Sequence, residues 1–146
     1  MINYFIPFEK IGDFKFDSDI DMYKSQFNFI HTPIDVSTNW ETYLLESEDL
    51  ELYVELNRIV SIVCREECLY KGRNIIGMDI DQFIRFYEIN PIGEIDKLYV
   101  SDKELQDVYE FDDIGLQVWC TSSIIRTVIA SGKSDDADLH ASEVKY

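Results

Sequence analysis

Hydrophobic and polar residues alternate over two stretches of the chain. In the first, residues 50–63, the alternation begins with Leu50, Leu52 and Val54 on one side and Glu51, Tyr53 and Glu55 on the other. A period of two is typical of a β-strand with one buried face. We therefore expect a hairpin over residues 50–63 that turns at Asn57 and Arg58, and a second over residues 115–130 that turns at residues 121–123.

The spacing becomes helical after Asp79. The apolar residues there recur at intervals of three and four: Ile80, Phe83, Ile84 and Tyr87. Asp79 suits the N-cap position, and Gln82 follows three residues later, as in a capping box. The same pattern sixty residues earlier predicts a helix from Ser18 or Asp19 to about residue 28.

The two halves of the chain match at nearly constant offsets, sixty residues for the helix starts and sixty-six for the hairpins. The connections at 30–47 and 94–114 follow no regular period, and Pro33 bars a continuous helix from the first. We predict an α+β fold, a tandem repeat of strand-helix-hairpin modules forming one antiparallel sheet with the helices packed on it. A single domain should span residues 1–130, with modules at about 1–66 and 67–130, followed by a polar tail at 131–146.

The charge of the chain narrows the range of its partners. The sequence has 29 acidic and 13 basic residues, a formal net charge of −16. Such a field repels nucleic acids and anionic membranes and accelerates association with a basic protein. No apolar run reaches the roughly 20 residues that span a bilayer. The N-terminal residues show no signal-peptide pattern. The chain has three cysteines, and because this number is odd it favours reduced thiols over a disulfide framework. We expect a cytoplasmic protein with no nucleic-acid or membrane partner.

The motifs that could carry chemistry are incomplete. Acids at residues 17–21 begin like an EF-hand loop, but Met22 stands where that loop needs glycine. His31 and His140, the only histidines, lack closely spaced partners for zinc. Adjacent acids such as Asp112 and Asp113 are typical of a solvated strand boundary. We predict no catalytic residue, no cofactor, no metal and no enzymatic activity.

Acidic and aromatic residues gather in the two irregular connections. Aromatic rings beside carboxylates suit an interface with a basic protein, because rings fill pockets and charges steer the encounter. The alternative, which the sequence leaves open, is that the rings belong to the core and the acids to its solvated rim. Our candidates for the interface are Asp107, Tyr109, Glu110, Phe111, Asp112 and Asp113 in the second connection, with Glu46, Glu48 and Asp49 in the first.

Three phrases carry a resemblance to a known family: IPFEKIGDFKF near the start, GMDIDQF at the second helix, and FDDIGLQVW in the late hairpin. They resemble small acidic bacterial immunity proteins, which are often encoded beside toxins of contact-dependent growth inhibition or related polymorphic toxin systems. The resemblance covers about residues 4–130. It departs at Asp17 and Ser18, which stand where the family phrase has Gly and Met.

The resemblance implies an inhibitor that binds one cognate toxin domain and occludes its active site. The acidity of the chain points to a basic toxin, such as a nuclease. Two alternatives stay open: a small carboxylate- or metal-dependent enzyme, and a regulatory module without a toxin. Phe83 and Trp119 are expected in the core, but alternation with Leu116 and Val118 would place Trp119 on the outer face as a binding anchor.

Overall fold

The computed structural model describes residues 1–45, 50–101 and 104–133. The first half of the chain forms β1 (Phe5–Ile6), β2 (Lys10–Ile11), β3 (Phe14–Lys15), α1 (Asp21–Lys24), β4 (Phe29–Asp35), β5 (Trp40–Leu45), β6 (Leu50–Glu55) and β7 (Arg58–Cys64). The second half forms β8 (Leu69–Tyr70), β9 (Arg73–Asn74), α2 (Ile80–Tyr87), β10 (Ile92–Ser101), β11 (Glu104–Phe111), β12 (Leu116–Thr121) and β13 (Ile124–Ser131). None of the helices in these ranges is long and apolar enough to cross a membrane.

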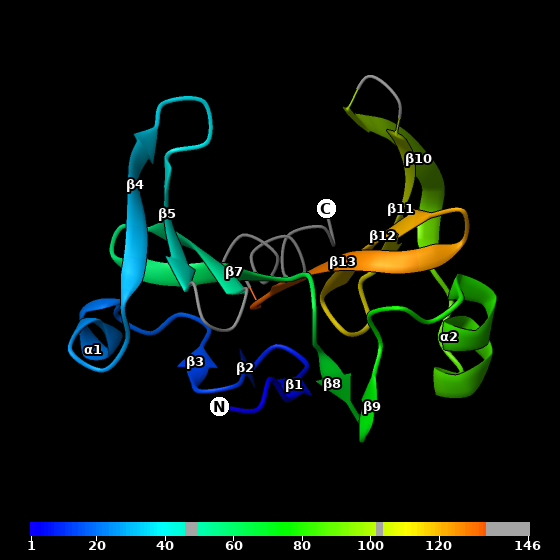
Figure 1. Cartoon of the computed structure of the whole chain (residues 1–146), viewed down its shortest axis with the longest axis horizontal. Helices are drawn as coiled ribbons and strands as arrows, with labels where there is room; N and C mark the ends of the chain where they lie inside the picture. Colours follow the sequence, from blue (N-terminus) through cyan, green and yellow to red (C-terminus); the bar gives the residue numbers. More distant parts are fainter. Residues whose placement is uncertain (46–49, 102–103, 134–146) are drawn as a thin grey trace, which may run out of the picture.

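Eight strands form one antiparallel sheet in the order β10-β11-β12-β13-β7-β6-β5-β4. Figure 1 shows β7 and β13 crossing its middle, with the hairpins β4–β5 and β10–β11 rising on either side. The helices and the small sheets β1–β3 and β8–β9 lie below it (Figure 1). We call the sheet face that packs against them the covered face, and the opposite one the inner face.

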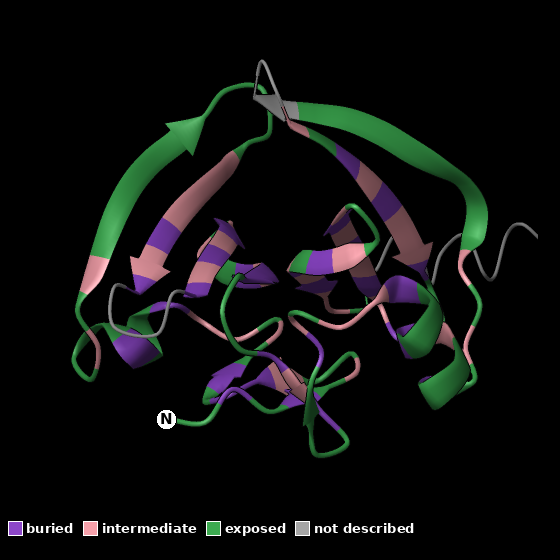
Figure 2. Ribbon diagram, turned by 45° about the vertical axis from the view of Figure 1, so that its right-hand side comes forward, coloured by how far each residue is buried: buried purple, intermediate pink, exposed green. Residues whose placement is uncertain are grey.

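The predicted α+β tandem repeat with helices packed on the sheet is wrong. The described residues are mostly β, since α1 has four residues and α2 has eight. The connections expected to be irregular form the hairpins β4–β5 and β10–β11. The outer strands β4 and β10 are exposed along most of their length (Figure 2), so burial imposes no alternation on them. Pro33 fits in β4 because an edge strand needs no donor on its free side.

The helix expected to reach residue 28 ends at Lys24. Aromatic packing accounts for the early end: Phe27 and Phe29 turn toward Phe14, with ring centroids 4.9 and 6.0 Å away. The N-cap residue of α1 is Ile20, which makes no side-chain cap bond, whereas the predicted residue Asp19 accepts from the Asp21 N–H through Oδ1 at 2.8 Å. At α2 the predicted cap is confirmed: Asp79 Oδ1 accepts from two backbone N–H groups, at 2.9 and 3.3 Å.

The two halves of the sheet are related about its centre. β13 pairs with β7 so that Val128 faces Cys64 and Ala130 faces Ile62, with the pair Ile129–Val63 between them. Each half also has a bridge from the start of its helix to its inner hairpin, which is β6–β7 in the first half and β12–β13 in the second. Asp19 pairs with Arg58 in one half, and Asp79 pairs with Ile124 in the other. Counted outward from the central pair β7–β13, the strands are β6, β5 and β4 on one side and β12, β11 and β10 on the other.

Asp17 and Gly77 show why the difference in sequence before the two helices leaves this arrangement intact. The Asp17 N–H donates to the Ile59 carbonyl and the Gly77 N–H to the Ile125 carbonyl, both at 2.8 Å. Both residues have positive φ, 61° for Asp17 and 94° for Gly77. Aspartate is among the residues that tolerate the left-handed region. The position requires a backbone conformation, which Asp17 supplies in place of glycine.

The core lies between the covered face and the elements below it. Phe14, Phe83 and Phe111 are the largest side chains with almost no exposure. The prediction that Phe83 lies in the core is confirmed, since it is 0% exposed and its ring centroid lies 5.3 Å from that of Phe111. Packing between α2 and β11 therefore anchors the second half of the sheet.

Candidate functional site

Of the residues predicted to form an interface, the six that the structure describes do not gather on one surface. Asp107, Tyr109 and Phe111 pair with core residues of β12 and lie on the covered face, whereas Glu110 lies on the inner face. Phe111 is 1% exposed and belongs to the core. Asp107 is bound to Lys97 at 2.9 Å. The remaining predicted residues divide as follows: Asp112 and Asp113 are exposed after β11, and Glu46, Glu48 and Asp49 lie outside the described residues.

The inner face carries a continuous row of side chains across all eight strands. Residues paired across neighbouring antiparallel strands lie on the same face. Successive pairings give the row Ile30, Leu44, Glu51, Val63, Ile129, Gln117, Glu110 and Ile92, in the order from β4 to β10. The centre of the row is apolar, and carboxylates stand on both sides of it.

Aromatic rings flank this centre. Tyr53 and Trp119 lie two residues beyond Glu51 and Gln117 on β6 and β12, and both are half-buried. Trp40 stacks on Tyr53 with a centroid separation of 5.3 Å. The prediction that Trp119 lies in the core is therefore wrong, and the alternative placement, on the face opposite to its core neighbours in β12, is correct.

Polar contacts fix the side chains around these rings. Trp119 Nε1 donates to Gln117 Oε1 at 2.8 Å, and Gln117 Nε2 donates to Glu110 Oε1 at 2.6 Å. In the other half, Arg65 binds Glu51 at 2.9 Å. Burial, with a smaller effect of the Glu51 charge, raises the pKa of Tyr53, so its phenol stays protonated. The inner face thus offers rings, carboxylates and an amide in fixed positions.

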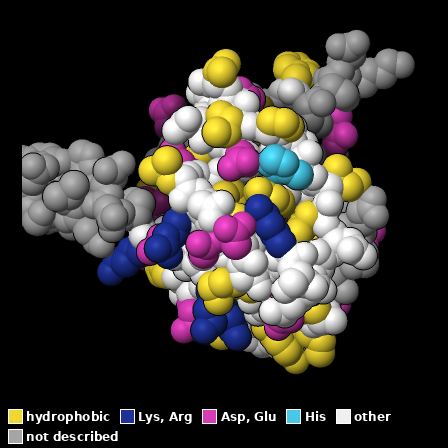
Figure 3. Space-filling model, turned by 90° about the vertical axis from the view of Figure 1, so that its left-hand side faces the viewer, with side chains coloured by type: hydrophobic (Ala, Val, Ile, Leu, Met, Phe, Trp, Pro, Cys, Tyr) yellow, Lys and Arg dark blue, Asp and Glu magenta, His cyan; other side chains and the backbone are white. Residues whose placement is uncertain are grey.

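A second feature lies beside α1, on the outer side of the β4–β5 hairpin. A pocket of about 540 Å³ is lined there by Lys24, Phe27, Asn28, Phe29, His31, Glu41, Tyr43 and Asn57. We call it the α1 pocket. Figure 3 faces this side of the molecule, where hydrophobic, basic and acidic side chains and the histidine gather.

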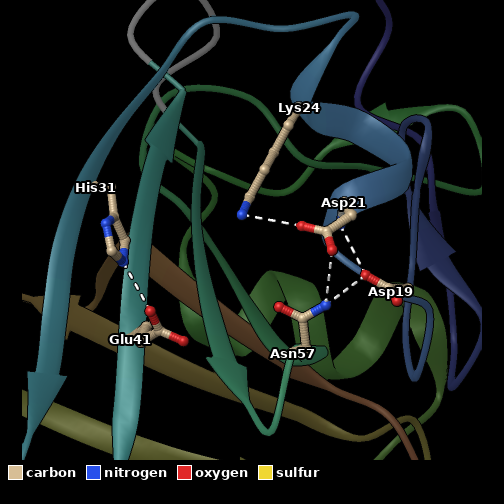
Figure 4. Close-up of polar contacts among 6 residues, drawn as sticks. All are labelled: Asp19, Asp21, Lys24, His31, Glu41 and Asn57. Atoms are coloured by element: carbon tan, nitrogen blue, oxygen red, sulfur yellow. Dashed lines mark hydrogen bonds and ion pairs between the residues drawn. The ribbon is translucent and has the colours of Figure 1, made fainter.

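Two polar groups of side chains stand at the α1 pocket (Figure 4). In the first, Lys24 Nζ binds Asp21 at 2.9 Å, and Asn57 Nδ2 donates to Asp21 at 3.2 Å and to Asp19 at 2.6 Å. The hydrogen bond from Lys24, followed by that from Asn57, lowers the pKa of Asp21. The same contact with Asp21 raises the pKa of Lys24. The Asp21 carboxylate and the Lys24 ammonium are therefore both charged near neutral pH.

The second group is the pair His31–Glu41, whose Nε2 and Oε1 atoms lie 2.8 Å apart (Figure 4). The His31 ring stacks on Tyr43, with centroids 4.5 Å apart. Lys24 Nζ lies over the same tyrosine ring, 5.4 Å from its centroid. Tyr43 therefore connects the two polar groups.

Sequence reasoning assigned no site to these residues. His31 and Glu41 are ten positions apart, and only the pairing of β4 with β5 brings them together. The missed signal was the polar β4–β5 segment itself, because a hairpin there places every second residue on one face. Among the described residues, no three His, Cys, Asp or Glu side chains form a metal-binding group. Burial raises the pKa of the Cys120 thiol to about 12, which leaves it protonated.

The comparisons with known proteins bear on the fold. No protein family model matches it, and no curated protein matches its sequence. Its structure is similar to the crystal structure of a cysteine-rich secretory protein from Staphylococcus aureus, with a TM-score of 0.52 and 15% identity over 100% of this chain. The chain spans 54% of the length of that protein. At this identity the likeness concerns the fold alone.

Proposed function

We propose that the chain is an immunity protein, a non-enzymatic inhibitor that acts in the bacterial cytoplasm and occludes the active site of a cognate toxin domain. The toxin domain is a basic protein, such as a nuclease, and it docks on the inner face. The observation that carries this proposal is the placement of Tyr53 and Trp119, two half-buried rings beside carboxylates on a face that the described helices leave uncovered.

The charge of the chain argues for a basic partner. A formal net charge of −16 attracts a basic domain over a distance of about one Debye length, roughly 10 Å at moderate salt. On the inner face, Glu51 and Glu110 stand on opposite sides of the central pair Val63–Ile129. A nuclease groove lined by lysine and arginine to hold phosphates would accept carboxylates in the same places.

The aromatic rings supply the affinity that exposed charges cannot. Exposed ion pairs typically contribute less than about 1 kcal/mol, whereas aromatic anchors near the middle of an interface often cost 2 kcal/mol or more when truncated. Trp119 and Tyr53 are held by neighbours in β12 and β5, Gln117 and Trp40, so little side-chain freedom is lost on binding. Charge brings the partner to the inner face, and the rings retain it.

The test is stopped-flow association and equilibrium binding with the toxin domain encoded beside this chain. We expect the association rate to fall steeply as salt is added. Trp119→Ala and Tyr53→Ala should each weaken binding by about tenfold or more, chiefly through faster dissociation. Glu110→Lys should slow association.

Matched controls separate the inner face from general effects of charge and size. Glu9→Lys makes the same charge change in the β1–β2 turn, and Leu56→Ala truncates an apolar residue that is 86% exposed in the β6–β7 turn. Both should bind within about twofold of the wild type. Binding that ignores salt and tolerates Trp119→Ala and Tyr53→Ala refutes docking on the inner face.

A further inference from the structure

The α1 pocket has a charge balance that favours a cation. Around it stand the carboxylates of Asp19, Asp21 and Glu41 and the ammonium of Lys24 (Figure 4). The carboxylates thus outnumber the ammonium by two when His31 is neutral. Glu41 Oε1 is bound to His31 at 2.8 Å, and within the described part of the chain no donor reaches Glu41 Oε2. The pocket therefore keeps an acceptor for an additional donor.

The aromatic wall suits the same kind of ligand. Phe27, Phe29 and Tyr43 line the pocket, and Phe29 stands edge-on to Tyr43 with centroids 5.7 Å apart. A cation over an aromatic face is attracted by the ring quadrupole, and arginine is the side chain found there most often. A planar guanidinium can lie against a ring and donate to a carboxylate at its edge.

Lys24 shows that a cation can occupy this place, because its ammonium lies over the Tyr43 ring and binds Asp21. The Lys24 side chain is 46% exposed, so it can swing into solvent at small cost. In the second half, Ile84 stands at the equivalent position sixty residues on and packs against the core. Lys24 is therefore a feature of the α1 pocket and not of the fold that the two halves share.

We propose that the α1 pocket binds an arginine side chain of the basic partner, which displaces Lys24 from Tyr43 and donates to Glu41. That the arginine belongs to a toxin docked on the inner face, whose contact would continue around the exposed edge strand β4 to this pocket, rests on the function proposed above, whereas the affinity of the pocket for a guanidinium does not. Lys24 acts as a built-in competitor, so its removal should strengthen the binding of another cation. A simple loss of structure at the pocket would produce the opposite change.

The experiment is an NMR titration of the isotope-labelled full chain with N-acetyl-arginine amide. We expect saturable shifts at the Asn57 side-chain amide and the Tyr43 backbone, with a dissociation constant in the millimolar range. The uncharged analogue N-acetyl-citrulline amide should give no saturation. Glu41→Gln should weaken arginine binding by about fivefold, and Lys24→Met should strengthen it by about threefold, as expected for partly exposed ion pairs.

The second half of the sheet provides matched controls. Lys97 and Asp107 form an equivalent ion pair at 2.9 Å, and Asp107 stands sixty-six residues after Glu41. Asp107→Asn and Lys97→Met change the net charge as the pocket variants do, and both should leave arginine binding unchanged. Equal effects of the two pairs of variants would refute the site, because they would show a response to net charge alone.

Two other results overturn the proposal. One is the absence of saturable shifts with the arginine probe. The other is saturable binding of inorganic phosphate that Lys24→Met abolishes, which would make the pocket an anion site. Arginine binding by a chain that does not bind its adjacent toxin would support the pocket and overturn the function proposed above.

Discussion

α1 and α2 begin from equivalent bridges to their hairpins but differ in length and in what they pack against. α2 has eight residues, carries a side-chain N-cap, and places Phe83 against Phe111. α1 stops after four residues, and a pocket with charged walls lies beside its end. The second half of the sheet uses this position for apolar packing, and the first half leaves it accessible to a ligand.

The outer hairpins extend the comparison to single contacts. Glu41 binds His31 on the covered face of one hairpin, and Asp107 binds Lys97 on the same face of the other. The geometry of the hairpin is thus shared, while the basic residue differs. Residues that differ between equivalent positions of the two halves are candidates for function. Residues that are the same belong to the fold that the two halves share.

The largest effect should come from the residue that fills the second half. Phe83→Ala should lower the free energy of unfolding by about 3–5 kcal/mol, because it leaves a cavity in a fully buried site. At the equivalent position, Tyr23→Phe should cost about 1 kcal/mol, through loss of the contacts of its hydroxyl with Ser18 and the Lys15 N–H. Chemical denaturation measures both, and a smaller cost for Phe83→Ala than for Tyr23→Phe would contradict the comparison.

An intermediate effect is expected at the helix caps. Asp79→Ala removes the acceptor for two N–H groups of α2 and should cost about 1 kcal/mol in denaturation experiments. Asp79→Asn, which keeps a capping oxygen, is the control and should cost a few tenths of that. Asp19→Ala removes an acceptor for one N–H group, that of Asp21 at 2.8 Å, and should reduce the helical content less, because α1 has only four residues. Equal losses of helical circular dichroism in the two alanine variants would argue against the difference between the helices.

The smallest effect concerns protonation at the α1 pocket. Lys24→Met should raise the pKa of Asp21 toward its ordinary value, since the hydrogen bond from Lys24 is the main cause of the lowering. The sign follows from linkage: a depressed carboxyl pKa stabilises the fold above the unfolded pKa, and this stabilisation is lost as pH falls through the folded pKa. A carboxyl-detected NMR titration measures the shift. Lys97→Met serves as control, and a change in the Asp21 pKa there would contradict the local contact.

Sequence reasoning found the inner hairpins and α2 because burial on one face imposes a period that the residues display. It missed β4 and β10, whose residues are exposed on both faces and therefore follow no period. It also misplaced the first turn, which lies at Leu56 and Asn57 with φ of 50° and 67°. Turns of this type usually contain glycine. Neither Leu56–Asn57 nor the equivalent pair Ser122–Ser123 does, so the local signal was absent.

The candidate sites, like the strands, could be predicted from the sequence only in part. Tyr53 and Trp119 could be placed on one face by alternation, although only the structure showed that Trp119 lies outside the core. The α1 pocket depends on residues from α1, β4, β5 and the β6–β7 turn, which no spacing in the sequence connects. Acidic residues alone pointed to β11, but their side chains divide between two faces of the sheet.

The pairing of β7 with β13 also has a consequence for how the chain folds. Every other pairing in the main sheet joins strands that follow each other along the chain, so each half can form from local hairpins. The contact between Cys64 and Val128 instead closes a loop of more than sixty residues. Closing such a loop costs conformational entropy before the contacts between β7 and β13 can form. The rate-limiting event in folding should therefore be the meeting of two preformed halves along this central seam.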